Sequence, residues 1–231
     1  MVMPYYQDDL ITLYLADCLP AMRKMPDKAF DLAICDPPYG NNLNGGRSEK
    51  DGWNSAIDWA KCNNGWNLNI PKQEYFIELR RVSSNQMIWG GNYFANILPN
   101  SECWLIWDKG QRDFSLADGE MAWTSFDKAM RIYSFSRARA NQETRIHPTQ
   151  KPVALYRWLL KNYAKPGDSI LDTHFGSGSI AIACHDLGFT LTAFEIDEEY
   201  LSTAVDRIKR YLRQPKMFKP VVDQPEQESF L

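Results

Sequence analysis

The chain has 231 residues, a length typical of one ordinary domain that buries its own core. A hydrophobic content of 44% and a charged content of 24% exclude a globally disordered or fibrous protein. No apolar run approaches the ~20 residues that span a bilayer, and the first ten residues lack a signal pattern, so we expect a cytoplasmic protein without a membrane partner. The five cysteines are scattered, odd in number and free of Cys-x-x-Cys spacing, which predicts reduced thiols and no metal site.

The net charge of −3 hides an uneven distribution of charge. Residues 128–165 contain nine Lys and Arg side chains and a single acid, Glu143, so this segment carries +8 and the rest of the chain −11. A concentrated basic surface on an acidic body is compatible with a polyanionic ligand. The alternative is an ordinary solvated surface.

The N-terminal part begins with alternating strand and helix patterns. β-Branched and aromatic residues predict a strand over residues 11–16, a short helix over 19–25, and an apolar strand over 31–35 that ends at Asp36. Residues 40–73 are rich in Asn and Gly, and a connection of this length in a compact domain is typically functional or disordered. After it, the pattern predicts a helix over 74–82 and strands over 86–89, 103–107, 121–125 and 131–135.

The C-terminal part repeats the alternation after a basic connector, residues 137–146. It predicts a helix over 153–164, a strand over 169–173, a helix over 179–187, a strand over 191–195, and a helix over 198–213 capped by Asp197. These patterns predict one α/β domain, residues 1–214, with a doubly wound, mostly parallel sheet that binds ligands beyond the carboxyl ends of its strands. Residues 215–231 are expected to form a poorly ordered tail.

A glycine-rich turn follows the strand over 169–173. Gly176 and Gly178 allow a tight turn and a close approach of a ligand to the main chain. The pattern is shorter than Gly-x-Gly-x-x-Gly, so a dinucleotide site is not indicated. Glu195 ends the next strand, where a carboxylate accepts hydrogen bonds from the two hydroxyls of a ribose. A ribosyl cofactor without a pyrophosphate is one interpretation, and ordinary packing and capping are the other.

Asp36, Pro37, Pro38 and Tyr39 form a rigid corner directly after the apolar strand over 31–35. The prolines fix φ and lack an N–H, which leaves the Asp36 carboxylate and the Pro37 carbonyl as acceptors beside the flat ring of Tyr39. Two acceptors and a stacking ring suit the exocyclic amine of adenine or cytosine, because they orient its weakly nucleophilic nitrogen. A strand ended by a proline turn is the alternative.

Three motifs in a fixed order give the chain a specific resemblance. They are Asp36-Pro-Pro-Tyr39, His147-Pro-Thr-Gln-Lys-Pro152 and Phe175-Gly-Ser-Gly178. In this order the chain resembles the amino-directed DNA methyltransferases of the β-type arrangement, over about residues 10–213. The resemblance implies a seven-stranded Rossmann-like methyltransferase sheet, S-adenosyl-L-methionine as cofactor and DNA as partner, with no metal.

The resemblance also implies roles for individual residues, with Asp36, Pro37, Pro38 and Tyr39 as the catalytic corner. Asp17 would lie near the cofactor's adenine and residues 147–151 near its methionine end. The implied cofactor-binding set is Asp17, Cys18, Asp36, His147, Thr149, Lys151, Asp172, His174, Gly176, Ser177, Gly178 and Glu195. The family usually has Asp-Pro-Phe before the glycines, whereas this chain has Asp172, Thr173 and His174. His174 is therefore either a cofactor contact or a core histidine.

In this family an intact Asp-Pro-Pro-Tyr motif is more usual for N6-adenine enzymes, so the resemblance implies methylation of adenine flipped out of DNA and stacked on Tyr39. Trp53, Trp59 and Trp66 either cover that base or anchor their loop. The DNA backbone would be bound by basic side chains of the +8 segment, namely Lys128, Arg131, Arg137, Arg139 and Arg145.

Other activities remain open at this stage. N4-cytosine or RNA methylation fits the same corner, whereas an inactive nucleic-acid-binding subunit would not need intact motifs. A small-molecule or protein-amide methyltransferase leaves the basic segment without a polyanion. A homodimer and a role in restriction-modification or phage protection are both compatible with the sequence. Because only residues 40–73 are spare for base readout, we expect a short or weak recognition sequence.

Overall fold

The computed structural model describes residues 3–40, 69–112, 117–143, 145–147 and 149–214. The predicted tail lies outside the described residues, as does most of the predicted loop, including Trp53, Trp59 and Trp66. Of the cysteines, Cys18, Cys35, Cys103 and Cys184 are described, and all four are buried free thiols, as predicted. No helix of the described part is long and apolar enough to cross a membrane.

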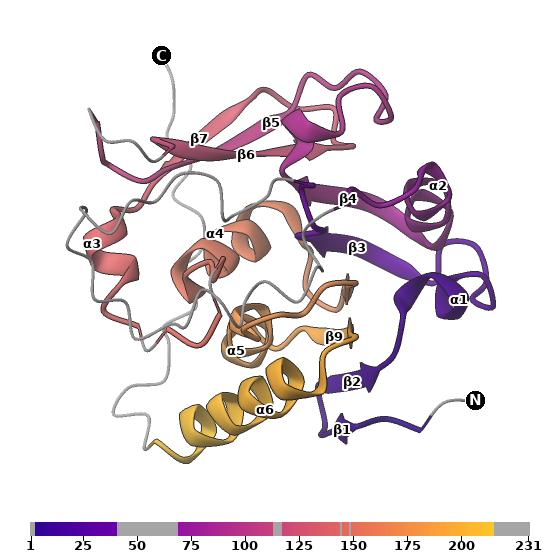
Figure 1. Ribbon diagram of the computed structural model, residues 1–231, viewed down its shortest axis with the longest axis vertical. Coiled ribbons are helices and arrows are strands. Elements are labelled where there is room, and N and C mark those ends of the chain that lie inside the picture. Colours follow the sequence, from indigo (N-terminus) through magenta and orange to yellow (C-terminus); the bar gives the residue numbers. More distant parts are fainter. Residues whose placement is uncertain (1–2, 41–68, 113–116, 144, 148, 215–231) are drawn as a thin grey trace.

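One nine-stranded sheet runs through the molecule in the order β1-β2-β9-β8-β3-β4-β6-β5-β7 (Figure 1). The strands are β1 (Tyr6–Gln7), β2 (Ile11–Leu15), β3 (Phe30–Cys35), β4 (Ser83–Trp89), β5 (Trp104–Asp108), β6 (Gly119–Thr124), β7 (Arg131–Ser134), β8 (Ser169–Asp172) and β9 (Thr190–Glu195). The predicted mostly parallel α/β sheet is confirmed. The strand count is nine instead of the expected seven, because β1 and β7 extend the sheet at its two edges.

The strand directions bring the sequence motifs to one edge of the sheet. Strands β2, β9, β8, β3 and β4 form consecutive parallel pairs. β6 is antiparallel to both β4 and β5, and β7 is parallel to β5, so β5 and β7 run in the same direction as the parallel group. Asp36, Asp172 and Glu195 therefore lie at the carboxyl ends of β3, β8 and β9, and Asp17 lies just beyond β2.

Helices cover both faces of this sheet (Figure 1). α4 (Val153–Tyr163), α5 (Ser179–Leu187) and α6 (Glu198–Arg213) pack on one face, and α1 (Cys18–Met22) and α2 (Gln73–Val82) on the other. The predicted cap is confirmed, because the Asp197 side chain accepts hydrogen bonds from the backbone N–H groups of Glu199 and Tyr200 at the start of α6. The apolar sides of the helices and both sheet faces form two buried clusters that hold the strand ends in place.

Three local features differ from the prediction. The first helix ends at Met22, because Lys24 and Met25 donate to Ala21 and Met22 in tight turns before Pro26. The basic connector contains a one-turn helix, α3 (Arg137–Ala140), whose first turn is capped by Ser136. The 3₁₀ helix η3 (Gly91–Tyr93), which was not predicted, follows β4.

Candidate active site

The Asp36 corner brings a carboxylate and an aromatic ring together at the end of β3. The Tyr39 hydroxyl donates to Asp36 Oδ1. The Tyr39 ring stacks on Tyr93 of η3, with centroids 5.0 Å apart and planes 13° from parallel. Pro37 is buried and Pro38 half-buried, so the corner is packed into the edge of the sheet. The structure therefore holds a carboxylate and a stacking ring side by side, as the sequence predicted.

Gly90 is a further part of this corner that sequence reasoning missed. Its φ of +71° lies in the left-handed region, and a Cβ at this position would lie 2.1 Å from Tyr39 Cε1. The Tyr39 ring therefore packs directly on the Gly90 backbone, which only glycine permits. The signal in the sequence was the Gly90-Gly91 pair directly after an apolar strand, at the edge that also carries Asp36.

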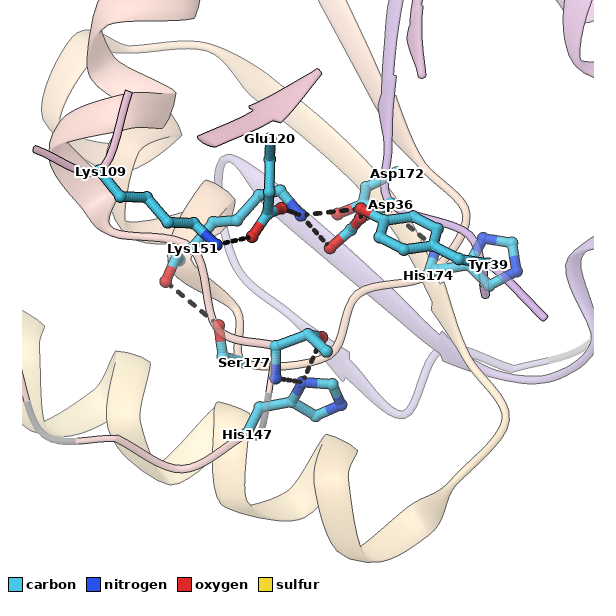
Figure 2. A network of polar contacts seen from close by, with 11 residues as sticks. Asp36, Tyr39, Lys109, Glu120, His147, Lys151, Asp172, His174 and Ser177 are labelled. Carbon is cyan, nitrogen blue, oxygen red and sulfur yellow. Dashed lines mark hydrogen bonds and ion pairs between the residues drawn. The ribbon is translucent and has the colours of Figure 1, made fainter. Parts of the chain in front are cut away.

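Lys151 also contacts this corner, although the sequence placed it with the cofactor's methionine end. Its Nζ lies 2.5 Å from Asp36 Oδ2 and 3.3 Å from the Tyr39 hydroxyl (Figure 2). The Lys151 side chain is only 1% exposed. Both oxygens of the Asp36 carboxylate are therefore hydrogen-bonded within the protein.

Two more charged residues, Glu120 and Lys109, complete a network that the sequence analysis did not anticipate. Lys151 Nζ lies 3.0 Å from Glu120 Oε2, and Lys109 Nζ lies 2.7 Å from Glu120 Oε1 (Figure 2). Glu120 lies on β6 and Lys109 follows β5, so both lie near the Asp36 edge of the sheet. The four charges alternate in sign along the chain of contacts, and they sum to zero.

This network sets the protonation of its carboxyl groups. Burial raises the pKa of Asp36, although Lys151 opposes this effect. Burial also acts to raise the pKa of Glu120, but Lys151 and Lys109 overcome it and lower that pKa to about 2. Glu120 is therefore a firmly ionised partner of Lys151, whereas Asp36 is a carboxylate with enhanced affinity for a proton.

The glycine turn lies at the carboxyl ends of β8 and β9. Gly176 and Gly178 have φ values of +52° and +71°, so the predicted tight turn uses the left-handed conformation. The Glu195 carboxylate accepts hydrogen bonds from the backbone N–H groups of Gly176 (2.8 Å), Ile196 (2.9 Å) and Asp197 (3.1 Å). Glu195 thus fixes the turn as well as presenting its carboxylate at the sheet edge.

Asp172 and His174 lie between the glycine turn and the Asp36 corner. Burial raises the pKa of Asp172 to about 8, because the backbone N–H of His174 and the nearby Lys151 offset its desolvation only in part. Burial lowers the pKa of His174 to about 4, so the imidazole is neutral; its Nδ1 lies 2.9 Å from Thr173 Oγ1. Its ring also makes an edge contact with Tyr75 of α2. His174 thus has protein partners, as expected of a core histidine.

The remaining predicted cofactor residues lie around the same edge. The His147 ring is next to the glycine turn, 3.7 Å from where a Gly176 Cβ would lie, and its Nδ1 is 3.1 Å from Thr149 Oγ1. Asp17 is exposed and caps α1 by accepting from Leu19, while Cys18 is buried beneath it. Ser177 is buried, and its carbonyl accepts from Arg207 of α6.

The five predicted DNA-binding side chains do not form one surface. Arg137 and Arg139 lie on α3, after the carboxyl end of β7, and the Arg137 N–H donates to the Lys109 carbonyl. Arg145 is close to His147, to whose carbonyl it donates at 3.4 Å. By contrast, Arg131 begins β7 and Lys128 packs over Tyr163 at the end of α4, so both lie at the edge opposite Asp36. Only three of the five side chains lie on the side of the site.

The carboxylate-lined edge suits a ligand that has hydroxyl groups and positive charge. Glu195 has free acceptor directions for hydroxyl groups beyond its three backbone contacts. A cation bound near Asp172 would stabilise that buried carboxyl group in its ionised form. The Asp36 corner, at the end of β3 on the same edge, offers carboxylate acceptors to a second ligand, beside the stacked rings of Tyr39 and Tyr93.

Comparison with known proteins gives a consistent result. A family model described as an N6/N4 DNA methylase matches residues 85–206, more than half of the chain. The type II methyltransferase M.HinfI of Haemophilus influenzae is 25% identical over 90% of this chain and 71% of its own length. The type II methyltransferase M.ScaI of Streptomyces caespitosus is 24% identical over 89% of this chain and 84% of its own length.

Solved structures agree on the fold. The cytosine-N4-specific PvuII DNA methyltransferase has a TM-score of 0.63 at 11% identity, over 94% of this chain and 92% of that chain. A complex of M1.HpyAVI with S-adenosylmethionine has a TM-score of 0.56 at 19% identity, over 86% of this chain and 100% of that chain. A putative DNA modification methylase from Thermus thermophilus, complexed with S-adenosyl-L-methionine, has a TM-score of 0.53 at 16% identity, over 87% and 95% of the two chains.

Proposed function

Because this chain belongs to the DNA methylase family that acts on exocyclic amino groups, we propose that it methylates N6 of adenine in DNA, using S-adenosyl-L-methionine. The observation that carries the choice of adenine is the Asp36 carboxylate beside Tyr39, since a serine-led corner is commoner for cytosine. The two relatives described above are type II methyltransferases, which supports a role in restriction-modification.

The residues around the glycine turn suit this cofactor. Glu195 would accept hydrogen bonds from the ribose hydroxyls, and the Gly176–Gly178 backbone would lie against the methionyl part. Asp172 would ionise next to the positive charges of the methionyl part, which lowers its raised pKa. When bound, S-adenosyl-L-methionine supplies an electrophilic methyl group on a sulfonium.

The Asp36 corner orients the target nitrogen. Asp36 and the Pro37 carbonyl would each accept one hydrogen of the amine, and the Tyr39 ring would stack on the base in place of the exposed Tyr93 ring. As the new N–C bond forms, the bond between the methyl group and the sulfonium would break to leave a neutral thioether, and the nitrogen gives up one proton. The Asp36 carboxylate is a suitable acceptor because burial raises its pKa. The protein therefore accelerates methyl transfer mainly by positioning the amine and by accepting its hydrogen bonds.

The target base is tested by product analysis. The purified chain is incubated with labelled S-adenosyl-L-methionine and either plasmid DNA of mixed sequence or RNA, and the hydrolysed nucleosides are separated. We expect the label in N6-methyladenine, and from the DNA alone. The Asp36→Ala variant should bind the cofactor but yield no product, because one amine hydrogen loses its acceptor. N4-methylcytosine would overturn the adenine assignment, and labelling of RNA in preference to DNA would overturn the choice of DNA.

A further inference from the structure

Lys151 lies between two carboxylates that both compete for its ammonium group. Its Nζ is 2.5 Å from Asp36 Oδ2 and 3.0 Å from Glu120 Oε2. The ring of Trp89 is 5.1 Å away, which adds a cation–π contact on another side. The side chain is almost fully enclosed, so its ammonium depends on protein partners for its hydrogen bonds.

The contact with Asp36 conflicts with the task of Asp36. One carboxylate oxygen accepts from Tyr39 and the other from Lys151, so each oxygen keeps one further acceptor direction and the target amine has to bind beside the ammonium group. A cation so close to the amine also opposes the positive charge that grows on the nitrogen during methyl transfer. The enzyme therefore needs a way to draw Lys151 off Asp36 without leaving a buried charge unpaired.

Glu120 meets this need. It already contacts the same ammonium, and its other oxygen is held 2.7 Å from Lys109, which fixes the carboxylate on β6. The low pKa of Glu120 keeps its carboxylate ionised at every pH at which the enzyme would be assayed. A small movement of Nζ, from Asp36 towards Glu120, exchanges one short ion pair for another.

We propose that Lys151 is a positioning residue with two alternative partners, and that it moves from Asp36 to Glu120 when the target amine arrives. In the base-free enzyme Lys151 keeps Asp36 ionised and oriented, and Glu120 takes over the ammonium during transfer. The proposal rests on the amino-directed activity but not on the identity of the base.

The pH dependence of this network involves several neighbours. Among the described residues, Asp36 faces Lys151, Glu120 and Tyr39, and it interacts electrostatically with Asp172 of β8 and Tyr156 of α4. Cys35 precedes it on β3 and is a fully buried thiol. Of these groups, Lys151 is the only one that favours the ionised form of Asp36 by its charge, so its removal raises the pH at which Asp36 ionises.

The test compares Glu120→Gln, Lys151→Met and the double variant in single-turnover methyl transfer across a range of pH, with cofactor affinity and folding measured separately. Glu74→Gln is the matched control, since Glu74 forms an exposed ion pair with Arg23. We expect Glu120→Gln to slow transfer roughly 10-fold or more at unchanged cofactor affinity, because Lys151 then stays on Asp36. Lys151→Met should move the acid limb of the profile to higher pH. At alkaline pH the double variant should be faster than Glu120→Gln alone, because no ammonium remains to oppose the positive charge that grows on the amine.

The proposal would be overturned if Glu120→Gln transferred the methyl group at the wild-type rate. It would also be overturned if the double variant were no faster than Glu120→Gln. Should Glu120→Gln fail to fold, an unmoved acid limb in Lys151→Met would overturn it equally. The adenine assignment is judged separately, because N4-methylcytosine as product would leave the behaviour of these variants unchanged.

Discussion

Gly90→Ala is the most direct test of how the Tyr39 ring is held. A Cβ at Gly90 would lie 2.1 Å from Tyr39 Cε1, 2.4 Å from Cδ1 and 2.7 Å from Cζ. To restore an ordinary carbon–carbon contact of about 3.6 Å, the ring must withdraw by about 1.5 Å. The new methyl group therefore acts on the stacking residue itself.

Gly188→Ala is a matched control for backbone strain. Gly188 ends α5 with φ +75°, close to the +71° of Gly90, and a Cβ there would meet no described atom within 4 Å. Each variant should lose about 1–2 kcal/mol of the free energy of unfolding from the left-handed backbone alone. Gly90→Ala should lose a further ~1–3 kcal/mol, because the ring and its neighbours must repack.

The two variants should differ most in catalysis. A displacement of about 1 Å in a positioning group typically costs on the order of 100-fold, so we expect a loss of that size in single-turnover transfer for Gly90→Ala and none for Gly188→Ala. The assays are single-turnover kinetics, urea unfolding and cofactor titration, and cofactor affinity should be unchanged in both. Equal transfer rates in the two variants would refute the requirement for Tyr39 in its observed position.

Three other sets of variants test the charged and titratable groups around the site. Glu195→Gln should weaken cofactor binding by roughly 10-fold or more, since hydrogen bonds to a charged group contribute about 1.5–3 kcal/mol, and an unchanged Kd by calorimetry would contradict this role. Replacing Arg137 and Arg139 with Ser should flatten the dependence of DNA affinity on salt by about 0.9 per lost phosphate contact. The matched pair Lys128→Ser and Arg131→Ser, at the opposite sheet edge, should leave the slope unchanged; equal slopes for both pairs would argue against a role for α3. The pKa of His174 is about 4 in the folded chain, whereas an unperturbed histidine has a pKa of 6.5. The contribution of the neutral imidazole to stability is therefore complete above pH 6.5 and is lost as the pH falls towards 4. Between neutral pH and a pH of about 4.5, the free energy of unfolding should therefore fall less in His174→Phe than in wild type, by roughly 2–3 kcal/mol, as measured by urea titration.

The features that depend on neighbouring residues could be predicted from the sequence alone. Hydrophobic periodicity predicted most helices and strands, and the strand-end positions of Asp36, Asp172 and Glu195 followed from it. Gly176 and Gly178 were predicted in a tight turn, because only glycine adopts the left-handed conformation without strain. In a parallel sheet all such strand ends meet at one edge, so local patterns sufficed to place the candidate site.

Which charged side chains meet could not be predicted from the sequence, because it depends on how distant segments pack together. Lys151 and Asp36 are 115 residues apart in the sequence. Glu120 lies near them because its strand, β6, pairs with β4 in the sheet. Ion pairs between distant residues leave no periodic trace in the sequence, since any Lys or Glu pattern also fits a solvated surface. The same holds for the basic segment: its charge was evident from composition, but strand direction separated Lys128 and Arg131 from Arg137 and Arg139.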